Sequence, residues 1–485
     1  MKKTLLLLSP MLLLAVNNAE ERLNFLENEI KNLKIEMKYH QDDLDERMPI
    51  IEKIEKKSIL DKINFSPELE LRMDKMDYKL GEIANESTEI YSNADDSMVG
   101  EQRRDEFSKN FDIASSIRFR LNMNAKIADN ISFYGRMVFA NSSQSNQRLC
   151  ILSRDIKSVA SSSALDIDRA YINYSPNKSS DYAFTFSFGQ LPTTGGTPMQ
   201  FAQGNKRQSM FPALVFDMNT YGIIGTQKIN NNTFIRAILA KAYTMRASFY
   251  PYQCNRENID NANVIGMYAD TKFSFLGDSL LSFGVNMLQN LKAHPYLGPD
   301  VGSSDAHVLG DTITLGLGLD IQKFAKQKFT FFIHTALSSP RGNGKSDDYQ
   351  IAEGNEAEGK TESGLTGFSE ADYAQGEMLS KDGYSIYLGS KYNFSNNLHF
   401  GAEYNYGSKY WFSATQGAED MYNKLATRGH VGEFYTTWHL HKKIEVKLGY
   451  MYSKEEYTGS GWHFGEPAKK DGTQKIAYLT LNARF

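Results

Sequence analysis

The feature that most constrains the fold is a long alternation of apolar and polar side chains in residues 112–140. From Asp112 to Ile127 every odd position is apolar or small, whereas most even positions are polar or charged. A short polar turn at Asp129-Asn130 follows, and the alternation then resumes as far as Ala140. Because successive side chains of a strand point to opposite faces of its sheet, this stretch predicts a hairpin of two long strands with one apolar face.

Each strand of this hairpin reaches the roughly 9–11 residues that a tilted strand needs to cross a bilayer. The polar face carries Arg118, Arg120 and Arg136, so the simplest interpretation places lipid on one face and water on the other. A sheet in hydrocarbon cannot leave an open edge, because its unpaired amides would find no water. The pattern therefore predicts a closed transmembrane barrel, with a secreted β-rich soluble protein as the alternative that composition does not exclude.

The N-terminus has the pattern of a secretory signal peptide. The chain has 485 residues and a mean hydropathy of −0.47, which is too polar for a helical membrane protein. Its longest apolar stretch, Leu5 to Val16, is shorter than the roughly 20 residues of a spanning helix. Because this stretch follows two lysines and precedes Ala19, we predict a signal peptide over residues 1–19. The net charge of −4 gives no reason to expect a nucleic-acid partner.

A helical pattern follows the predicted signal peptide. Apolar residues recur at steps of three and four, and most residues between them are charged or polar: Leu23, Leu26, Ile30, Leu33 and Met37. This heptad spacing predicts a periplasmic helical coiled coil over residues 20–58, with a single amphipathic helix as the alternative. The barrel is predicted over residues 63–485.

Hairpins like the first recur along the rest of the chain. Their short polar turns are predicted at residues 175–178, 230–232, 277–278, 325–327, 395–397 and 441–443, and long segments connect one hairpin to the next. Short turns on one side and long loops on the other are typical of outer-membrane barrels. Counting a first strand from Phe65 to Asp74 gives an all-β, antiparallel barrel of about 16 strands.

The last strand ends on an aromatic residue. Its apolar or small residues alternate up to the terminus: Ala477, Leu479, Leu481, Ala483 and Phe485. This pattern resembles the C-terminal signal by which bacterial barrels are recognised for outer-membrane insertion. We therefore expect Phe485 to act as an insertion signal for the barrel-assembly machinery.

With these features, the chain resembles the trimeric, sixteen-stranded general porins. It resembles still more a group of bacterial porin-like outer-membrane proteins that carry a periplasmic coiled coil ahead of the barrel. The residues that carry the resemblance are Asp168-Arg169-Ala170-Tyr171, Gly189 to Pro198 and Val215-Phe216-Asp217. The resemblance implies a homotrimer in the outer membrane of a Gram-negative bacterium, in contact with membrane lipid and lipopolysaccharide.

The same resemblance makes Leu191 to Pro212 the third outer loop, which in porins folds into the lumen and narrows it. Gly195, Gly196 and Pro198 suit a constriction loop that bends against the wall. An ordinary exposed loop is the alternative, since Gly and Pro mark turns in general.

Charged residues are expected to line the lumen. Arg118, Arg120, Arg136 and Arg169 come from three adjacent predicted strands and should form a basic strip, which we call the arginine strip. The acidic residues expected on the inner face come from both ends of the sequence: Glu68, Glu70, Glu403, Glu433 and Glu445. Opposed charges across a narrow passage would set an ion preference, whereas mutually paired charges would give little selectivity.

Two functions remain open at this stage. The first is a porin for passive diffusion of small hydrophilic solutes and ions. The second is a structural or binding protein, with the coiled coil attached to the cell wall and the loops as a ligand or adhesion surface. A polar inner face with interspersed glycines favours the first, because a plugged barrel should carry larger inward side chains.

The sequence predicts no enzyme, cofactor or metal. No Gly-x-Ser-x-Gly motif is present, and His439 and His441 lack the further ligands that a zinc site needs. Cys150 and Cys254 fall in predicted outer loops, and whether they pair is left open.

Overall fold

The computed structural model describes residues 23–24, 26–38, 41, 48, 63–81, 90–91, 98–100, 107–143, 163–191, 201, 211–243, 262–274, 276–292, 308–344, 378–415, 420, 422–457, 459–460, 467 and 469–485. The chain divides into two compact units, Met1–Asn64 and Phe65–Phe485. In the first unit, residues 23–24 and 26–38 are helical, and the apolar stripe from Leu23 to Met37 is exposed to solvent. None of the described helices has the length and apolar character needed to cross a membrane.

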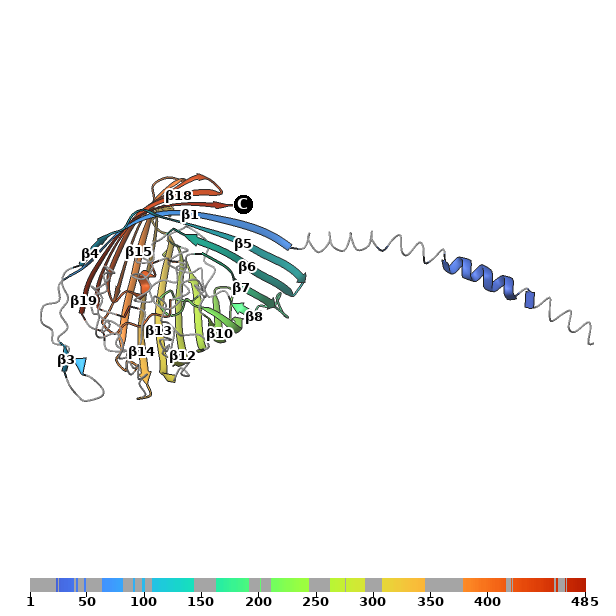
Figure 1. Ribbon diagram of the computed structural model, residues 1–485, viewed down its shortest axis with the longest axis horizontal. Coiled ribbons are helices and arrows are strands. Elements are labelled where there is room, and N and C mark those ends of the chain that lie inside the picture. The colour runs from blue at the N-terminus through green and yellow to red at the C-terminus, as the bar shows by residue number, and fades with distance from the viewer. Residues whose placement is uncertain are drawn as a thin grey trace, which may run out of the picture. The chain divides into compact units, whose positions relative to one another are not determined.

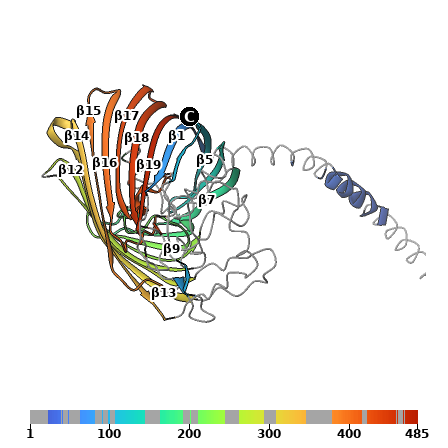
Figure 2. The same cartoon turned by 60° about the vertical axis from the view of Figure 1, so that its left-hand side comes forward.

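The second unit is an antiparallel sheet of 17 strands that closes on itself (Figure 1, Figure 2). The first strand, β1 (Ile63–Leu80), pairs with the last, β19 (Lys469–Arg484), and also with β4 (Phe107–Asn110) and β5 (Ala114–Ala128). Because β4 and β5 share one neighbour and follow each other in sequence, they occupy one position in the wall. The wall therefore has sixteen positions, which confirms the predicted closed barrel of 16 antiparallel strands.

The remaining elements follow in sequence order around the wall. They are β6 (Ile131–Ser142), β7 (Ser163–Tyr174), β8 (Phe184–Leu191), β9 (Asn219–Lys228), β10 (Thr233–Tyr243), β11 (Asn263–Phe273), β12 (Asp278–Lys292), β13 (Val308–Lys323), β14 (Phe329–Gly342), β15 (Gly383–Asn393), β16 (Leu398–Gly407), β17 (Gly429–His441) and β18 (Ile444–Tyr457). Two short helices, α4 (Phe324–Gln327) and η3 (Lys424–Ala426), and a separate pair of strands, β2 (Ile90–Tyr91) and β3 (Met98–Gly100), complete the described elements.

The connections have the predicted asymmetry in length. Every second connection is short, for example residues 129–130, 229–232, 394–397 and 442–443. The others are long, for example residues 143–162 and 343–382. Because β1 begins where the antiparallel β19 ends, the start and end of the barrel lie at the same end as the short turns.

The first strand is longer than predicted: β1 continues to Leu80, beyond the predicted end at Asp74. Up to Asp74, apolar residues of β1 point outward and charged ones inward; beyond it Met76, Tyr78 and Leu80 are buried inside while Lys75, Asp77 and Lys79 point outward. The outward face therefore changes from apolar to charged after Asp74, and the inward face changes from charged to apolar. This reversal ended the pattern by which the strand was predicted. An outward face of charged residues is expected where a strand extends beyond the bilayer.

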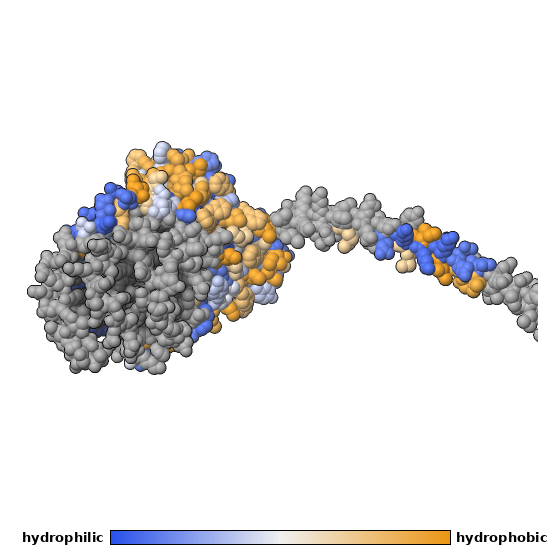
Figure 3. All heavy atoms as spheres, viewed as in Figure 1, coloured by the Kyte–Doolittle hydropathy of each residue, from blue (hydrophilic) through white to orange (hydrophobic). Residues whose placement is uncertain are grey.

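The outward face of the wall is apolar over its middle height. Outward residues of the long hairpin β13–β14 are examples: Ile313, Leu315, Leu317, Ile333 and Leu337 are 40–55% exposed. Figure 3 shows apolar side chains gathered on the part of the wall that is visible. In water such a surface is unfavourable, whereas a bilayer would cover it.

Candidate functional site: the barrel interior

The arginine strip lies on the inner face of the wall. Arg120, Arg136 and Arg169 are buried, whereas their outward neighbours Phe119 and Met137 are exposed. Arg136 and Arg169 are direct partners across β6 and β7. Arg118, which is partly exposed, shares the inner face with Arg120 on β5.

Two predicted acidic residues neutralise part of this strip. Arg118 Nη2 lies 2.7 Å from Glu70 Oε2, and Arg120 Nη1 lies 3.5 Å from Glu68 Oε2. Both carboxylates are on β1, which is the neighbour of β5. They are therefore ion-paired along the wall and do not oppose the arginines across the lumen.

The inner face of β5 to β8 is polar and only partly covered. Asn122, Asn124, Tyr171 and Asn173 are half-buried, and Tyr134 is 37% exposed. The rings of Tyr134 and Tyr171 stack with centroids 5.2 Å apart. The buried apolar cluster inside the barrel reaches this side only at its edge, where Leu191 of β8 belongs to it and Tyr171 of β7 packs against it; among the described residues, β5 and β6 contribute none of its members.

A first inward segment, Phe211–Met218, packs against that other side. Phe211 lies 4.3 Å from the ring of Tyr268 by centroids, and the backbone N–H of Ala213 donates to His334 Nδ1 at 3.3 Å. Val215 and Phe216 are both buried. Consecutive residues are buried here because the segment is not part of a strand: β9 begins only at Asn219.

Phe201 also packs inside the barrel, with its ring centroid 4.4 Å from that of Phe332. Both rings are buried. The constriction-loop residues Gly195, Gly196 and Pro198 lie outside the described residues. Their role therefore stays a prediction.

A second inward segment connects β16 to β17 and comprises residues 411–415, 420 and 422–428. Trp411 and Phe412 are fully buried, and the N–H of Phe412 donates to Ser338 Oγ at 3.1 Å. The two inward segments meet where the N–H of Asp217 donates to the carbonyl of Ala414 at 2.8 Å. The sequence interpretation missed this segment, although Trp411-Phe412 was an apolar signal in a predicted loop.

The inward glycines do not widen the interior. Gly284, Gly389, Gly401 and Gly449 are each the cross-strand partner of an aromatic residue. A Cβ built on Gly401 would lie 2.1 Å from the ring of Tyr435, and one on Gly449 would lie 2.2 Å from the ring of Tyr478. These rings occupy the space above the glycines, so the glycine pattern did not indicate an open lumen.

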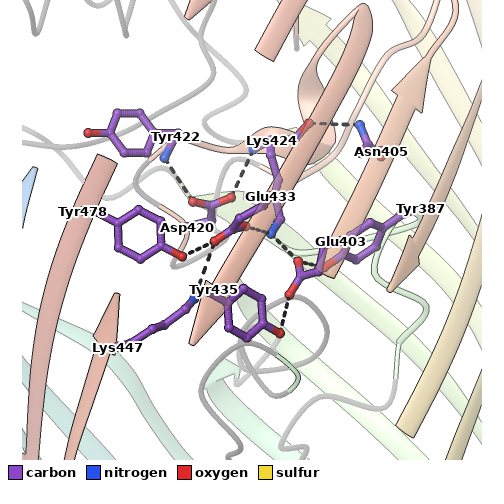
Figure 4. Close-up of polar contacts among 10 residues, drawn as sticks. All are labelled: Tyr387, Glu403, Asn405, Asp420, Tyr422, Lys424, Glu433, Tyr435, Lys447 and Tyr478. Atoms are coloured by element: carbon purple, nitrogen blue, oxygen red, sulfur yellow. Dashed lines mark hydrogen bonds and ion pairs between the residues drawn. The ribbon is translucent and has the colours of Figure 1, made fainter. Parts of the chain in front are cut away.

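Glu403 and Glu433 lie in a buried network between the second inward segment and the wall (Figure 4). They are direct partners on β16 and β17, and Lys424 Nζ donates to Oε2 of both. Three tyrosines complete the network: Tyr387 donates to Glu403 Oε2 at 2.7 Å, Tyr435 donates to Glu403 Oε1 at 3.0 Å, and Tyr478 donates to Glu433 Oε1.

Lys424 is therefore held as a cation. Burial by itself would lower the pKa of Lys424, but the carboxylates of Glu403 and Glu433 offset burial, and the pKa is raised above its ordinary value. Such a lysine is an ammonium at neutral pH. This residue was not predicted, because it lies in a loop, where no periodicity assigns its side chain to a face.

A histidine pair lies near the short-turn end. The rings of His399 and His439 have centroids 5.0 Å apart, and His439 Nδ1 lies 3.4 Å from Glu445 Oε2. Among the described residues no group of three potential ligands is arranged to hold a metal ion. Cys150 and Cys254 lie outside the described residues, so their pairing stays open.

These features define the class of protein: a closed, sixteen-stranded antiparallel barrel with polypeptide segments inside it. The chain belongs to the family described as protein of unknown function (DUF3373), whose model matches residues 108–483. No curated protein matches the sequence.

Several solved outer-membrane proteins are similar in structure. OprB of Pseudomonas putida matches with a TM-score of 0.45 and 11% identity, over 88% of this chain and 96% of OprB. The trimer form of OmpT of Vibrio cholerae matches with a TM-score of 0.42 and 10% identity, over 87% of this chain and 99% of OmpT. The channel DcaP of Acinetobacter baumannii matches with a TM-score of 0.40 and 11% identity, over 87% of this chain and 98% of DcaP.

Proposed function

We propose that this protein is an outer-membrane channel for passive diffusion of small hydrophilic solutes and ions. The observation that carries the proposal is the polar inner face of β5 to β8, which includes the arginine strip. Apolar packing inside the barrel is concentrated on the opposite part of the wall. The path is thus expected to follow β5 to β8, because water-filled passages are lined by polar side chains.

The proposal also covers the orientation of the barrel, its processing and its oligomeric state. The short turns would lie in the periplasm and the long loops outside, after removal of residues 1–19 and insertion by the barrel-assembly machinery. The apolar stripe from Leu23 to Met37 is exposed in the single chain, which favours its association into a coiled coil. We infer a homotrimer in contact with lipid and lipopolysaccharide, and no enzymatic activity.

The exposed stripe is also compatible with the second function, a structural protein that is attached to the cell wall through its N-terminal helix. A helix with an unpaired apolar stripe can attach the barrel to the cell wall as well as to copies of itself. This role does not compete with a channel, since it uses a different unit of the chain.

Planar-bilayer recording of the purified full chain tests the channel. We expect discrete conductance steps, and Asn122→Trp on the inner face of β5 should reduce the step size because it narrows the proposed path. The matched variant Met123→Trp, on the outward face of the same strand, should leave it unchanged. Absence of conductance above the lipid baseline would contradict the proposed function.

A further inference from the structure

We propose that Glu403 and Glu433 form a binding site for alkylammonium groups in the barrel wall, which Lys424 of the second inward segment occupies. A solute with a primary ammonium group would compete with Lys424 for this site. The inference rests on the proposed function, because it assigns a solute class to the same interior.

The two carboxylates require a cation between them. Glu403 and Glu433 are cross-strand partners, and their residues are only 4% and 6% exposed. Like charges directly opposite each other in a sheet are destabilising, and buried charges are costly unless paired. Lys424 Nζ donates to both carboxylates and so serves as their shared counter-ion.

The wall holds the carboxylates without help from the loop. Tyr387, Tyr435 and Tyr478 donate their hydroxyls to three of the four carboxylate oxygens, and all three residues are on strands. Lys447, on β18, lies 3.5 Å from Glu433 Oε1. Among the residues that contact the two carboxylates in these bonds, only Lys424 belongs to a loop, so the site is preorganised for whichever cation replaces it.

The surroundings suit an organic ammonium. Lys424 Nζ lies 5.7 Å from the ring centroid of Tyr387, within the range of a cation–π contact. Two carboxylates face Lys424 and Lys447, so the four charges sum to zero, and removing Lys424 leaves one net negative charge. A monovalent cation with N–H donors and an apolar stem matches this vacancy in charge and shape.

The backbone of the loop that carries Lys424 is held by bonds that do not involve the Lys424 side chain. Its carbonyl accepts from Asn405 Nδ2 at 3.0 Å, and the next carbonyl, of Leu425, accepts from Trp411 Nε1 at 2.9 Å. These bonds fix the backbone, whereas the four-carbon side chain is free of them. Competition therefore requires rotation of one side chain and not withdrawal of the segment.

The variant Lys424→Met tests the site, with butylammonium chloride as the probe and tetramethylammonium chloride as a cation without N–H donors. Butylammonium should raise the unfolding temperature of folded Lys424→Met. Wild type should need at least about tenfold more butylammonium, because the tethered lysine competes at high effective concentration. The matched control is Lys470→Met, which removes another buried lysine, one that is paired with the single carboxylate of Glu455. It should also be less stable than wild type, but because Lys424 still occupies the two-carboxylate site, its response to butylammonium should stay near that of wild type.

The double variant Lys424→Met/Glu403→Gln should lose the response to butylammonium. Equal responses of Lys424→Met and wild type, or equal responses to the two probes, would overturn the inference. If Lys424→Met folds poorly, the readout is its refolding yield, which butylammonium alone should raise; equal yields with both probes would also overturn it. Absence of current in wild type would contradict the proposed function, while the unfolding temperature would still decide the binding site.

Discussion

Phe485 donates its backbone N–H to the carbonyl of Pro67, 2.9 Å away, which joins the last residue of the chain to the first strand of the barrel. The ladder between β1 and β19 continues from this point, from Glu68 opposite Arg484 to Leu80 opposite Gly472. Closure of the barrel therefore depends on the final strand reaching its full length. The ring of Phe485 is 66% exposed, so it is available to an outside partner.

The first prediction is that Phe485→Asp impairs assembly. A carboxylate in place of the terminal ring should weaken recognition of the C-terminal signal and place a charge beside the seam. We expect a several-fold loss of heat-modifiable barrel on gels of outer membranes. Phe394→Asp is the matched control, because Phe394 is similarly exposed in a short turn but is not at the terminus; an equal loss in both variants would argue against a specific signal.

The second prediction concerns orientation. Epitope tags inserted in residues 143–162 or 343–382 should be accessible on intact cells, because long loops of such barrels face outside. Tags at 230–232 or 395–397 should become accessible only after the outer membrane is permeabilised. The reverse pattern of labelling would show that the barrel is inserted the other way.

The third prediction concerns the glycines beneath inward rings. Gly449→Ala should lower the free energy of unfolding by about 1–3 kcal/mol, the usual range for overpacking, because the new methyl meets the ring of Tyr478. Gly432→Ala on β17 is the control, since a Cβ there meets no atom within 4 Å. Urea unfolding in detergent micelles, followed by tryptophan fluorescence, measures both. Equal stability of the two variants would contradict the packing described.

The fourth prediction is that the N-terminal stripe contributes to a trimer. Ile30→Asp places a charge in the middle of the apolar stripe and should shift the full chain toward smaller species in cross-linking and light scattering. Glu29→Asp, a neighbouring change that leaves the stripe intact, should not. A wild-type chain that is monomeric in mild detergent would contradict the trimer itself.

The wall was predictable from sequence because a bilayer imposes a simple rule on it. Outward residues such as Leu315 and Leu448 had to be apolar, and that requirement repeats at every second position. The rule no longer holds where a strand extends beyond the lipid. For this reason the sequence predicted neither the part of β1 beyond Asp74 nor the short strand β4. There the outward residues are Lys75 and Lys79, and the apolar side chains point inside.

The interior was less predictable, because its contacts join residues that are distant in sequence. Tyr422 of the second inward segment donates to Asp74 of the first strand, and Lys424 joins Glu403 to Glu433. Glu403 and Glu433 were expected to line the pore, with mutual pairing of the lumen charges as the alternative, and the structure places them in a closed network with a loop lysine. Periodicity assigns a side chain to a face, and it carries no information on which loop packs against that face.

The last prediction is selectivity, and it follows from the arginine strip. Arg118 and Arg120 are paired with Glu70 and Glu68, which offsets part of the positive charge that the arginine strip brings to this wall. Screening acts over about 8 Å at physiological salt, so these charges should favour anions weakly and exclude neither sign. Replacing Arg118, Arg120 and Arg136 by Gln removes the ion pairs of Glu68 and Glu70 with Arg120 and Arg118 and should shift the reversal potential toward cations. The neutral exchange Arg118→Gln with Glu70→Gln removes one charge of each sign and should leave the potential near that of wild type. If the triple variant folds, conducts and keeps the wild-type potential, the ions do not pass along β5 to β8.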